Sequence, residues 1–167
     1  MLLVLPLQFG NDAGAAGLSP QYIEGYLMFL MNECSIEVPQ GWNDQSINVI
    51  SSNSAMAPGL TLTVTRDGLP FGMSFQEYLE EQIGQVSKAM IDFKTVGRQS
   101  VLLDGIEAAE IECSWMSKQG PMHQIIYMMP TPAGRAMVVT ASMPGRMSAG
   151  QANEVRRIVQ TLKFRRM

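Results

Sequence analysis

The segment Gly59–Arg66 alternates apolar and polar residues without a break, and this alternation constrains the fold most directly. Leu60, Leu62 and Val64 fall on one face of an extended chain, and threonines fall on the other face. This period of two residues predicts a half-exposed β-strand. The chain therefore contains at least one strand of a β-sheet, and the segments that follow decide the fold class.

A helix is predicted directly after this strand. Asp67-Gly68-Leu69-Pro70 forms a turn, and Ser74 with Glu77 forms a capping box that opens a helix. Apolar side chains then recur at helical spacing up to Met90. A second capping box, Ser148 with Gln151, opens the last predicted helix.

Four strands are predicted between the two helices. They cover residues 93–103, 106–116, 122–129 and 135–143, with a tight hairpin turn at Asp104-Gly105. Strands followed by a helix, four strands and a helix are typical of an α+β fold. The sequence therefore predicts an antiparallel β-sheet packed by two helices.

The length of 167 residues gives room for one domain with one core. We expect residues 1–25 to form a flexible N-terminal extension and residues 26–167 to form a single domain. The first nine residues are apolar, but they lack the basic start of a secretory signal. The run is also shorter than the about 20 residues of a membrane span. Asn32 and Glu33 before Cys34 disfavour a lipoprotein cleavage site.

No catalytic constellation is evident. The chain has one histidine, His123, which leaves a His-based triad or a metal cluster without partners, and we interpret it as a structural or rim residue. Cys113 follows the alternation of core positions, and both Cys34 and Cys113 are expected to be reduced and half-buried. Glu110 and Glu112 lie about 7 Å apart on one strand face like an acid–base pair, but we expect a solvated face. The sequence predicts a non-enzyme without metal or cofactor. Its net charge of −3 disfavours nucleic-acid binding.

The most specific motif lies in residues 32–50. Pro39 and Gly41 interrupt strand pairing, Trp42 is expected to anchor a corner, and Asp44 with Gln45 should open a second strand. An acidic short strand followed by P-x-G-W-x-D-Q-S-I-N resembles the effector-associated-gene (Eag) chaperones of bacterial type VI secretion, a branch of the DcrB-like family. The resemblance covers roughly residues 28–164, and it implies a Mog1/PsbP-like form of the α+β fold.

The resemblance also implies a function. Eag chaperones are not enzymes, and they hold hydrophobic transmembrane segments of toxins before export. By this resemblance, the chain is a cytoplasmic, homodimeric chaperone or adaptor that does not itself insert into a membrane. Its partner would be a type VI secretion effector with N-terminal transmembrane helices near a PAAR domain. The alternative is a DcrB-like envelope protein acting in import or lipoprotein assembly. A small hydrolase would need a second catalytic partner for His123 or Cys113.

Methionines and two glutamines suggest where a client binds. The chain has fourteen methionines, whose flexible side chains suit surfaces that repack around apolar partners, although a Met-rich core is the other interpretation. Gln82 and Gln124 fall within apolar stripes, where an amide needs a partner in the client or in a nearby loop backbone. The resemblance implies that glutamines at these positions line the client-binding face. The expected groove is lined by Ile47, Val49, Leu62, Val64, Gln82, Val86, Gln124, Ile126 and Met128.

Overall fold

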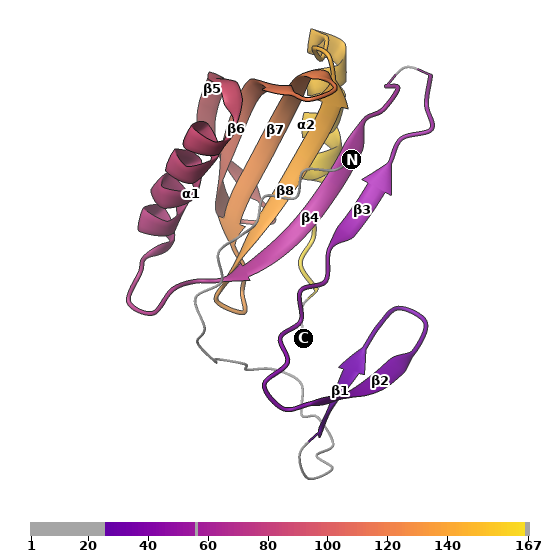
Figure 1. Cartoon of the computed structure of the whole chain (residues 1–167), viewed down its shortest axis with the longest axis vertical. Coiled ribbons are helices and arrows are strands. Elements are labelled where there is room, and N and C mark those ends of the chain that lie inside the picture. Colours follow the sequence, from indigo (N-terminus) through magenta and orange to yellow (C-terminus); the bar gives the residue numbers. More distant parts are fainter. Residues whose placement is uncertain (1–25, 56, 166–167) are drawn as a thin grey trace. The chain divides into compact units, whose positions relative to one another are not determined.

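The computed structural model of the chain describes residues 26–55 and 57–165. These residues belong to two compact units, residues 26–45 and residues 46–165 (Figure 1). The extension predicted over residues 1–25 lies outside the described residues. The single domain expected over residues 26–167 stays a prediction.

The first unit is a β-hairpin. Strands β1 (Tyr26–Leu30) and β2 (Ser35–Pro39) pair antiparallel, and the Met31 N–H donates to the Cys34 carbonyl across the turn at 2.8 Å. The predicted acidic strand is confirmed as β2. The corner that follows differs from the prediction, because the Trp42 side chain is 66% exposed and does not anchor it. The Trp42 N–H instead donates to the Pro39 carbonyl at 3.4 Å, so backbone contacts shape the corner.

The second unit is built on a six-stranded antiparallel sheet with the strand order β3-β4-β8-β7-β6-β5. Its strands are β3 (Asn48–Ser51), β4 (Thr61–Gly68), β5 (Ile91–Leu103), β6 (Ile106–Ser117), β7 (Gly120–Pro130) and β8 (Arg135–Pro144). The first of these begins at Asn48, later than the start expected at Asp44. Asp104 and Gly105 form the predicted hairpin turn, with φ values of 51° and 81°. Both angles lie in the left-handed region that a two-residue hairpin favours.

Two helices complete the part of the chain that the structure describes, α1 (Phe75–Ala89) and α2 (Ala149–Gln160). Both predicted capping boxes are confirmed. The Ser74 hydroxyl accepts a hydrogen bond from the Glu77 N–H at 3.3 Å, and the Ser148 hydroxyl accepts one from the Gln151 N–H at 3.1 Å. Each helix therefore begins where a serine pairs a backbone N–H that the helix itself leaves unpaired.

The helices lie on opposite faces of the sheet (Figure 1). Ile125 and Met129 of β7 pack in one core with Val155 of α2. Met128, which points to the other face, packs with Leu79 of α1. Because successive residues of a strand point to opposite faces, β7 contributes to both layers. This arrangement confirms the predicted α+β class with an antiparallel sheet packed by two helices.

Candidate functional site

The sheet face that carries α1 is hollowed beside that helix into a groove of 610 Å³. Side chains of α1 and of strands β4 to β8 line it. Apolar residues of α1 share buried clusters with residues of β6, β7 and the first part of β8, and no residue of β4 belongs to these clusters. The groove therefore lies between α1 and the β4 side of the sheet.

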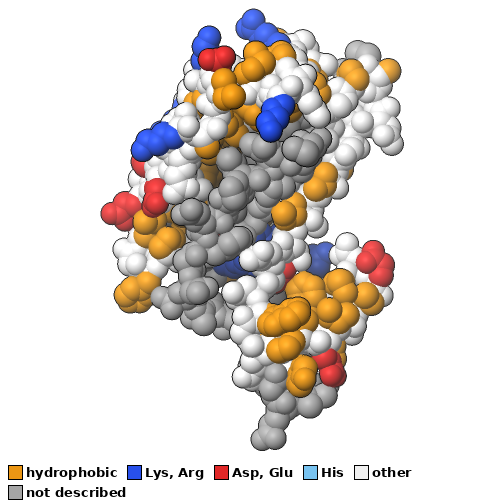
Figure 2. All heavy atoms as spheres, viewed as in Figure 1, with side chains coloured by type: hydrophobic (Ala, Val, Ile, Leu, Met, Phe, Trp, Pro, Cys, Tyr) orange, Lys and Arg blue, Asp and Glu red, His pale blue; other side chains and the backbone are white. Residues whose placement is uncertain are grey.

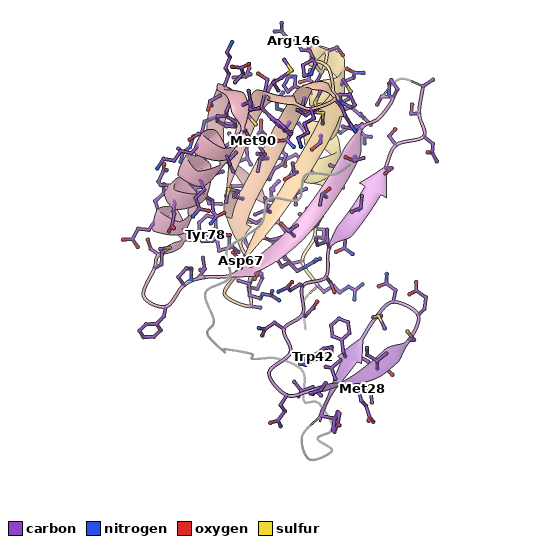
Figure 3. All side chains as sticks on the ribbon, in the orientation of Figure 1. Met28, Trp42, Asp67, Tyr78, Met90 and Arg146 are labelled. Carbon is purple, nitrogen blue, oxygen red and sulfur yellow. The ribbon has the colours of Figure 1, made fainter. Side chains whose placement is uncertain are left out.

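The position of α1 is fixed by a contact that joins it to β4. The Tyr78 hydroxyl at the beginning of α1 donates to an Asp67 carboxylate oxygen near the end of β4 at 3.0 Å (Figure 3). Burial raises the pKa of Tyr78 well above its ordinary value, and the negative charge of Asp67 adds to this effect. The phenol therefore remains a hydrogen-bond donor over the whole physiological pH range.

Apolar side chains form the side of the groove nearest α1. Val86 of α1 and Met90, the residue directly after α1, pack with Trp115 of β6 in one buried cluster. Ile126 and Met128 of β7 continue this surface along the floor. Such a surface is suited to bind a partner with apolar side chains, because contact removes both surfaces from water.

The opposite side of the groove carries hydroxyl groups. Thr61, Thr63 and Thr65 occupy every second position of β4, and Thr140 of β8 lies directly opposite Thr63. Among the described residues, none of these four hydroxyls has a hydrogen-bond partner. Thr63 is nevertheless only 9% exposed. These hydroxyls form a polar strip, Thr61/Thr63/Thr65/Thr140, which is available to polar groups of a bound segment.

The two predicted glutamines differ in their contacts. Trp115 Nε1 donates to Gln124 Oε1 at 3.0 Å, and Gln124 Nε2 donates to the Ser142 hydroxyl at 2.9 Å. Gln124 is thus satisfied by two side chains rather than by a loop backbone. Gln82 lines the groove and is half-buried, and its amide has no partner within residues 26–55 and 57–165. Of the two glutamines, Gln82 is therefore the one whose amide has no partner among the described residues.

The structure does not bring all nine predicted site residues together. The groove is lined by five of them: Gln82, Val86, Gln124, Ile126 and Met128. Val49 pairs with Thr63 and so shares the groove face of the sheet, and Ile47 directly precedes β3. Leu62 and Val64 lie on the opposite face, where they pack against the core beneath α2.

The expected position of Leu62 and Val64 in the groove is therefore wrong. Alternation along β4 separates two faces correctly, but it does not say which face a later helix will cover. The threonine strip was missed for the same reason. Its sequence signal is that the polar face of β4 carries threonines over 61–65 where a fully solvated strand commonly carries charges.

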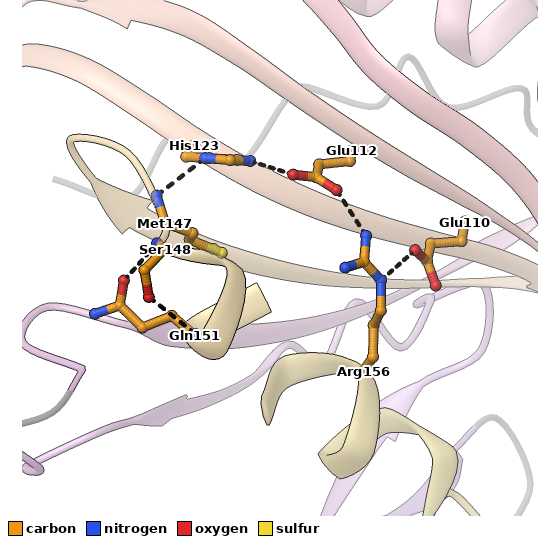
Figure 4. Close-up of polar contacts among 7 residues, drawn as sticks. All are labelled: Glu110, Glu112, His123, Met147, Ser148, Gln151 and Arg156. Carbon is orange, nitrogen blue, oxygen red and sulfur yellow. Dashed lines mark hydrogen bonds and ion pairs between the residues drawn. The ribbon is translucent and has the colours of Figure 1, made fainter. Parts of the chain in front are cut away.

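A buried polar cluster lies on the α2 face (Figure 4). Arg156 of α2 donates from Nε to Glu110 at 2.8 Å and from a terminal nitrogen to Glu112 at 2.6 Å. Glu110 is only 4% exposed. The solvated face expected for these two glutamates is therefore wrong, because a helix residue more than forty positions later covers and neutralises them.

His123 links this cluster to the beginning of α2. Its Nδ1 accepts a hydrogen bond from the Met147 N–H at 3.0 Å, and its Nε2 lies 3.0 Å from a Glu112 carboxylate oxygen (Figure 4). Because Nδ1 is an acceptor, Nε2 carries the proton and donates to Glu112. His123 is 4% exposed, and the structural role predicted for it is consistent with these contacts.

Two further groups bear on catalysis. Burial raises the pKa of the Cys113 thiol to about 12, and the charge of Glu112 adds to this effect. A fully buried thiol of this kind is a poor nucleophile. Cys34 is exposed, so neither cysteine is half-buried as expected. Among the described residues, no group of three or more His, Cys, Asp or Glu side chains is placed to hold a metal ion.

The hairpin unit presents an apolar surface of its own. Side chains of this kind gather over β1 and β2 in Figure 2. They include Leu30, which is 66% exposed, and Met28, which is also exposed (Figure 3). Neither of the two described helices is both long and apolar enough to cross a membrane.

Comparison with known proteins gives similarities in sequence and in fold. Effector EagT6 of Pseudomonas aeruginosa is 26% identical over 89 residues, which cover 53% of this chain and 62% of that protein. The chain thus matches less than two-thirds of the length of that relative. A Pseudomonas aeruginosa protein of unknown function, PA94, has a similar structure, with a TM-score of 0.71 and 18% identity over 86% of this chain and 100% of its own.

A second solved structure, LpqN of Mycobacterium tuberculosis, which is involved in cell envelope biogenesis, has a TM-score of 0.51 at 14% identity. The similarity covers 71% of this chain and 84% of that protein. At these identities, both structures support the fold alone. The DcrB family model matches residues 33–161, which is most of the chain and includes every strand and helix that forms the groove. The chain belongs to the DcrB family.

Proposed function

We propose that this chain is a chaperone or adaptor that binds an apolar helix of a type VI secretion effector and shields it before export. The observation that carries the proposal is the groove beside α1, in which an apolar side faces a strip of threonine hydroxyls that have no partner among the described residues. The sequence similarity to EagT6 supports the assignment to type VI secretion. The proposal includes a cytoplasmic location, a homodimeric chaperone, and a client with N-terminal transmembrane segments near a PAAR domain.

The dimensions of the sheet support this occupant. Strands β7 and β8, which form part of the groove floor, have 11 and 10 residues, and at about 3.4 Å per residue they are roughly 34–37 Å long. The apolar length of a membrane-spanning helix is about 30 Å. Burying on the order of 1,000 Å² of apolar surface contributes about 25 kcal/mol before the costs of association and ordering are subtracted. One sheet can therefore cover one helix with a useful net affinity.

The polar groups of the groove suit a helix that packs through small residues. Transmembrane helices associate through Gly, Ala, Ser and Thr, which bring backbone carbonyls and hydroxyls close to a partner. The Gln82 amide and the hydroxyls of Thr63 and Thr140 offer donors and acceptors to such groups. A purely aliphatic helix would leave these groups unpaired on binding, at a cost of about 1–3 kcal/mol for each group that is fully desolvated.

Co-expression tests the proposal. The client is the N-terminal apolar fragment of a PAAR-containing effector encoded beside this chain, produced with and without the chain. We expect the soluble amount of the fragment to rise several-fold when the chain is present. An effector fragment that lacks its apolar segments is the control, and its soluble amount should not depend on the chain.

A client fragment that is equally abundant and soluble alone would contradict the chaperone role. The same result would favour the alternative, a DcrB-like envelope protein acting in import or lipoprotein assembly. That alternative has the family match in its support, but it does not require binding of an effector fragment.

A further inference from the structure

The groove carries opposite charges at its two ends. Thr61, Thr63 and Thr65 occupy alternate positions on the groove face of β4, and Asp67 is the next residue in this row, just beyond the groove. At the other end lies Lys118, in the turn between β6 and β7. It is the one charged residue among the described residues that line the groove. The groove is therefore negative at one end and positive at the other.

Other charged residues near the two ends preserve this difference. Two arginines lie close to Asp67 in the sheet, but Arg66 and Arg135 share the α2 face with residues of the main core. At the positive end, the last turn of α1 adds Lys88, which offsets Asp92 at the beginning of β5. The charges at the two ends of the groove therefore remain opposite in sign.

The distance between the two charges matches a bound helix. Asp67 pairs with Ala136 of β8, and Met122, which follows the turn of Lys118, pairs with Pro144. Ala136 and Pro144 are eight residues apart, which corresponds to about 27 Å along the strand. A helix of about 18 residues has this length, and about 20 residues span a membrane. A transmembrane helix that lies along the strands would therefore have one end beside each charge.

We propose that the groove binds a client helix in one orientation, with the helix N-terminus beside Asp67 and the C-terminus beside Lys118. The first turn of a helix has unpaired N–H groups and a partial positive charge, and the last turn has unpaired carbonyls and a partial negative charge. One Asp67 oxygen accepts from the Tyr78 hydroxyl, and the other has no partner among the described residues (Figure 3). This oxygen can accept from the first N–H groups of the client, and Lys118 Nζ can donate to its last carbonyls.

Two contacts determine the preference for this orientation. Each favourable contact of a full charge with a helix end strengthens binding about two- to fivefold at low ionic strength. An inverted helix would place like charges together at both ends, so two favourable contacts would become two unfavourable ones. The proposed orientation is therefore favoured by about tenfold or more. This inference rests on the proposed function, because it takes an apolar helix as the occupant, and it adds the direction of that helix.

Distances between spin labels test the orientation. The probe is a synthetic helix of about 20 Leu, Ala and Ser residues with uncharged, blocked ends and a nitroxide at its N-terminus or its C-terminus. The protein carries its label at Gly68→Cys, where an added Cβ would meet no atom of the described residues within 4 Å, or at the exposed Gln119→Cys. Cys34→Ser removes the exposed native thiol, and Cys113 is buried. Electron paramagnetic resonance at low salt gives the distance between the two labels.

We expect one dominant distance for each pair of labels. The N-terminal label of the peptide should lie nearer to the label at Gly68→Cys, which is beside Asp67 in the chain. The C-terminal label should lie nearer to the label at Gln119→Cys, which is beside Lys118.

Substitutions that remove one charge test the cause of the orientation. Lys118→Gln and Asp67→Asn should each weaken peptide binding about two- to fivefold. Asp67→Asn keeps an acceptor for the Tyr78 hydroxyl, and thermal melts verify that each variant folds. Lys163→Gln removes the same charge at an exposed position after α2 and should bind the peptide like the unaltered chain. Full affinity in Lys118→Gln would contradict the role of this lysine.

The outcomes separate this inference from the proposed function. Peptide that binds with two equally populated distances from each site, or with the inverted pair of distances, would overturn the orientation and leave the helix-binding groove supported. A peptide that binds to none of the chains would refute the helix-binding groove itself, and the orientation with it.

Discussion

Arg156 forms ion pairs with both Glu110 and Glu112, whose side chains lie on the α2 face of β6, the face away from the groove. Glu112 accepts a second contact from His123, whose other ring nitrogen accepts the Met147 N–H just before α2. Desolvation raises the pKa of Glu112, but the hydrogen bonds from Arg156 and His123 together outweigh it and lower the pKa below its usual value. The folded protein therefore favours the ionised form of Glu112 over the protonated form.

Acid should weaken the fold through Glu112. A carboxylate whose pKa is lower in the folded state stabilises the protein above its unfolded pKa and loses that contribution as pH falls through the folded value. The unfolded reference is the ordinary value of 4.5, so the loss begins near that pH. The urea concentration at the midpoint of unfolding should decrease when the pH is lowered from 5 to 3. We expect this decrease to be smaller in Glu112→Gln than in the unaltered chain. Glu107→Gln changes an exposed carboxylate of the same strand and should preserve the full acid loss. Identical acid profiles for all three chains would contradict the role of Glu112.

At the scale of elements, the helices and the hairpin that are marked by capping or turn residues in the sequence were predictable. The capping serines Ser74 and Ser148 marked the beginning of both helices, and Asp104-Gly105 marked the hairpin, because these signals lie within a few residues of the structure they create. Five of the expected site residues, on α1 and β7, line the groove because their spacing puts them on one face of each element, and their contact with a client stays a prediction.

Relations between distant elements were not predictable from spacing. Leu62 and Val64 were assigned to the wrong face because α2, which covers them, begins more than eighty residues later. Glu110 and Glu112 of β6 were expected to be solvated because the spacing of residues does not reveal their partner Arg156, which lies on α2 more than forty residues later. In both cases a pattern of period two identified the set of residues that share a face, and tertiary packing decided what that face contacts.

The threonine face of β4 provides a test at this scale. A chain with Thr61→Val, Thr63→Val and Thr65→Val retains the side-chain shape and keeps β-branched residues suited to a strand, so its melting temperature should stay equal or rise slightly. Each hydroxyl that bonds the client contributes roughly 1 kcal/mol, so in a titration the effector fragment should bind about fivefold more weakly if one hydroxyl is used and about 100-fold more weakly if all three are. Thr95→Val alters an exposed threonine of β5 and serves as the control, with no change in binding. Tighter binding by the triple variant would show that the strip does not contact the client.

At the scale of the 46–165 unit, the sheet separates two tasks. Its α2 face holds the main core, in which Ile125, Met129 and Val155 are fully buried. Its other face is covered by α1 on one side and leaves the groove on the other. Because neighbouring residues of β7 point to opposite faces, the two tasks meet in adjacent positions of one strand. The same substitution made at two adjacent positions of β7 should therefore affect stability at one position and binding at the other.

Ile125→Asp and Ile126→Asp make that comparison with identical chemistry. Ile125 is 0% exposed, so a carboxylate there would be buried without a partner, at a cost of several kcal/mol. A loss of that size removes much of the free energy of unfolding of a typical domain, which is about 5–15 kcal/mol. We therefore expect Ile125→Asp to be largely unfolded by circular dichroism. Ile126 is half-buried and lines the groove, where a carboxylate can reach water in the client-free protein. Its cooperative thermal melt should persist.

The same Ile126→Asp chain should fail to retain the effector fragment in a pull-down. On binding, an apolar helix would displace water from the carboxylate and offer no positive partner, and the resulting cost would abolish a micromolar complex. Asn153→Asp, which adds the same charge at an exposed position of α2, should bind like the unaltered chain. If Ile126→Asp unfolds as Ile125→Asp does, Ile126 belongs to the core and the groove assignment is wrong. If it folds and still binds the fragment, the client contacts another surface.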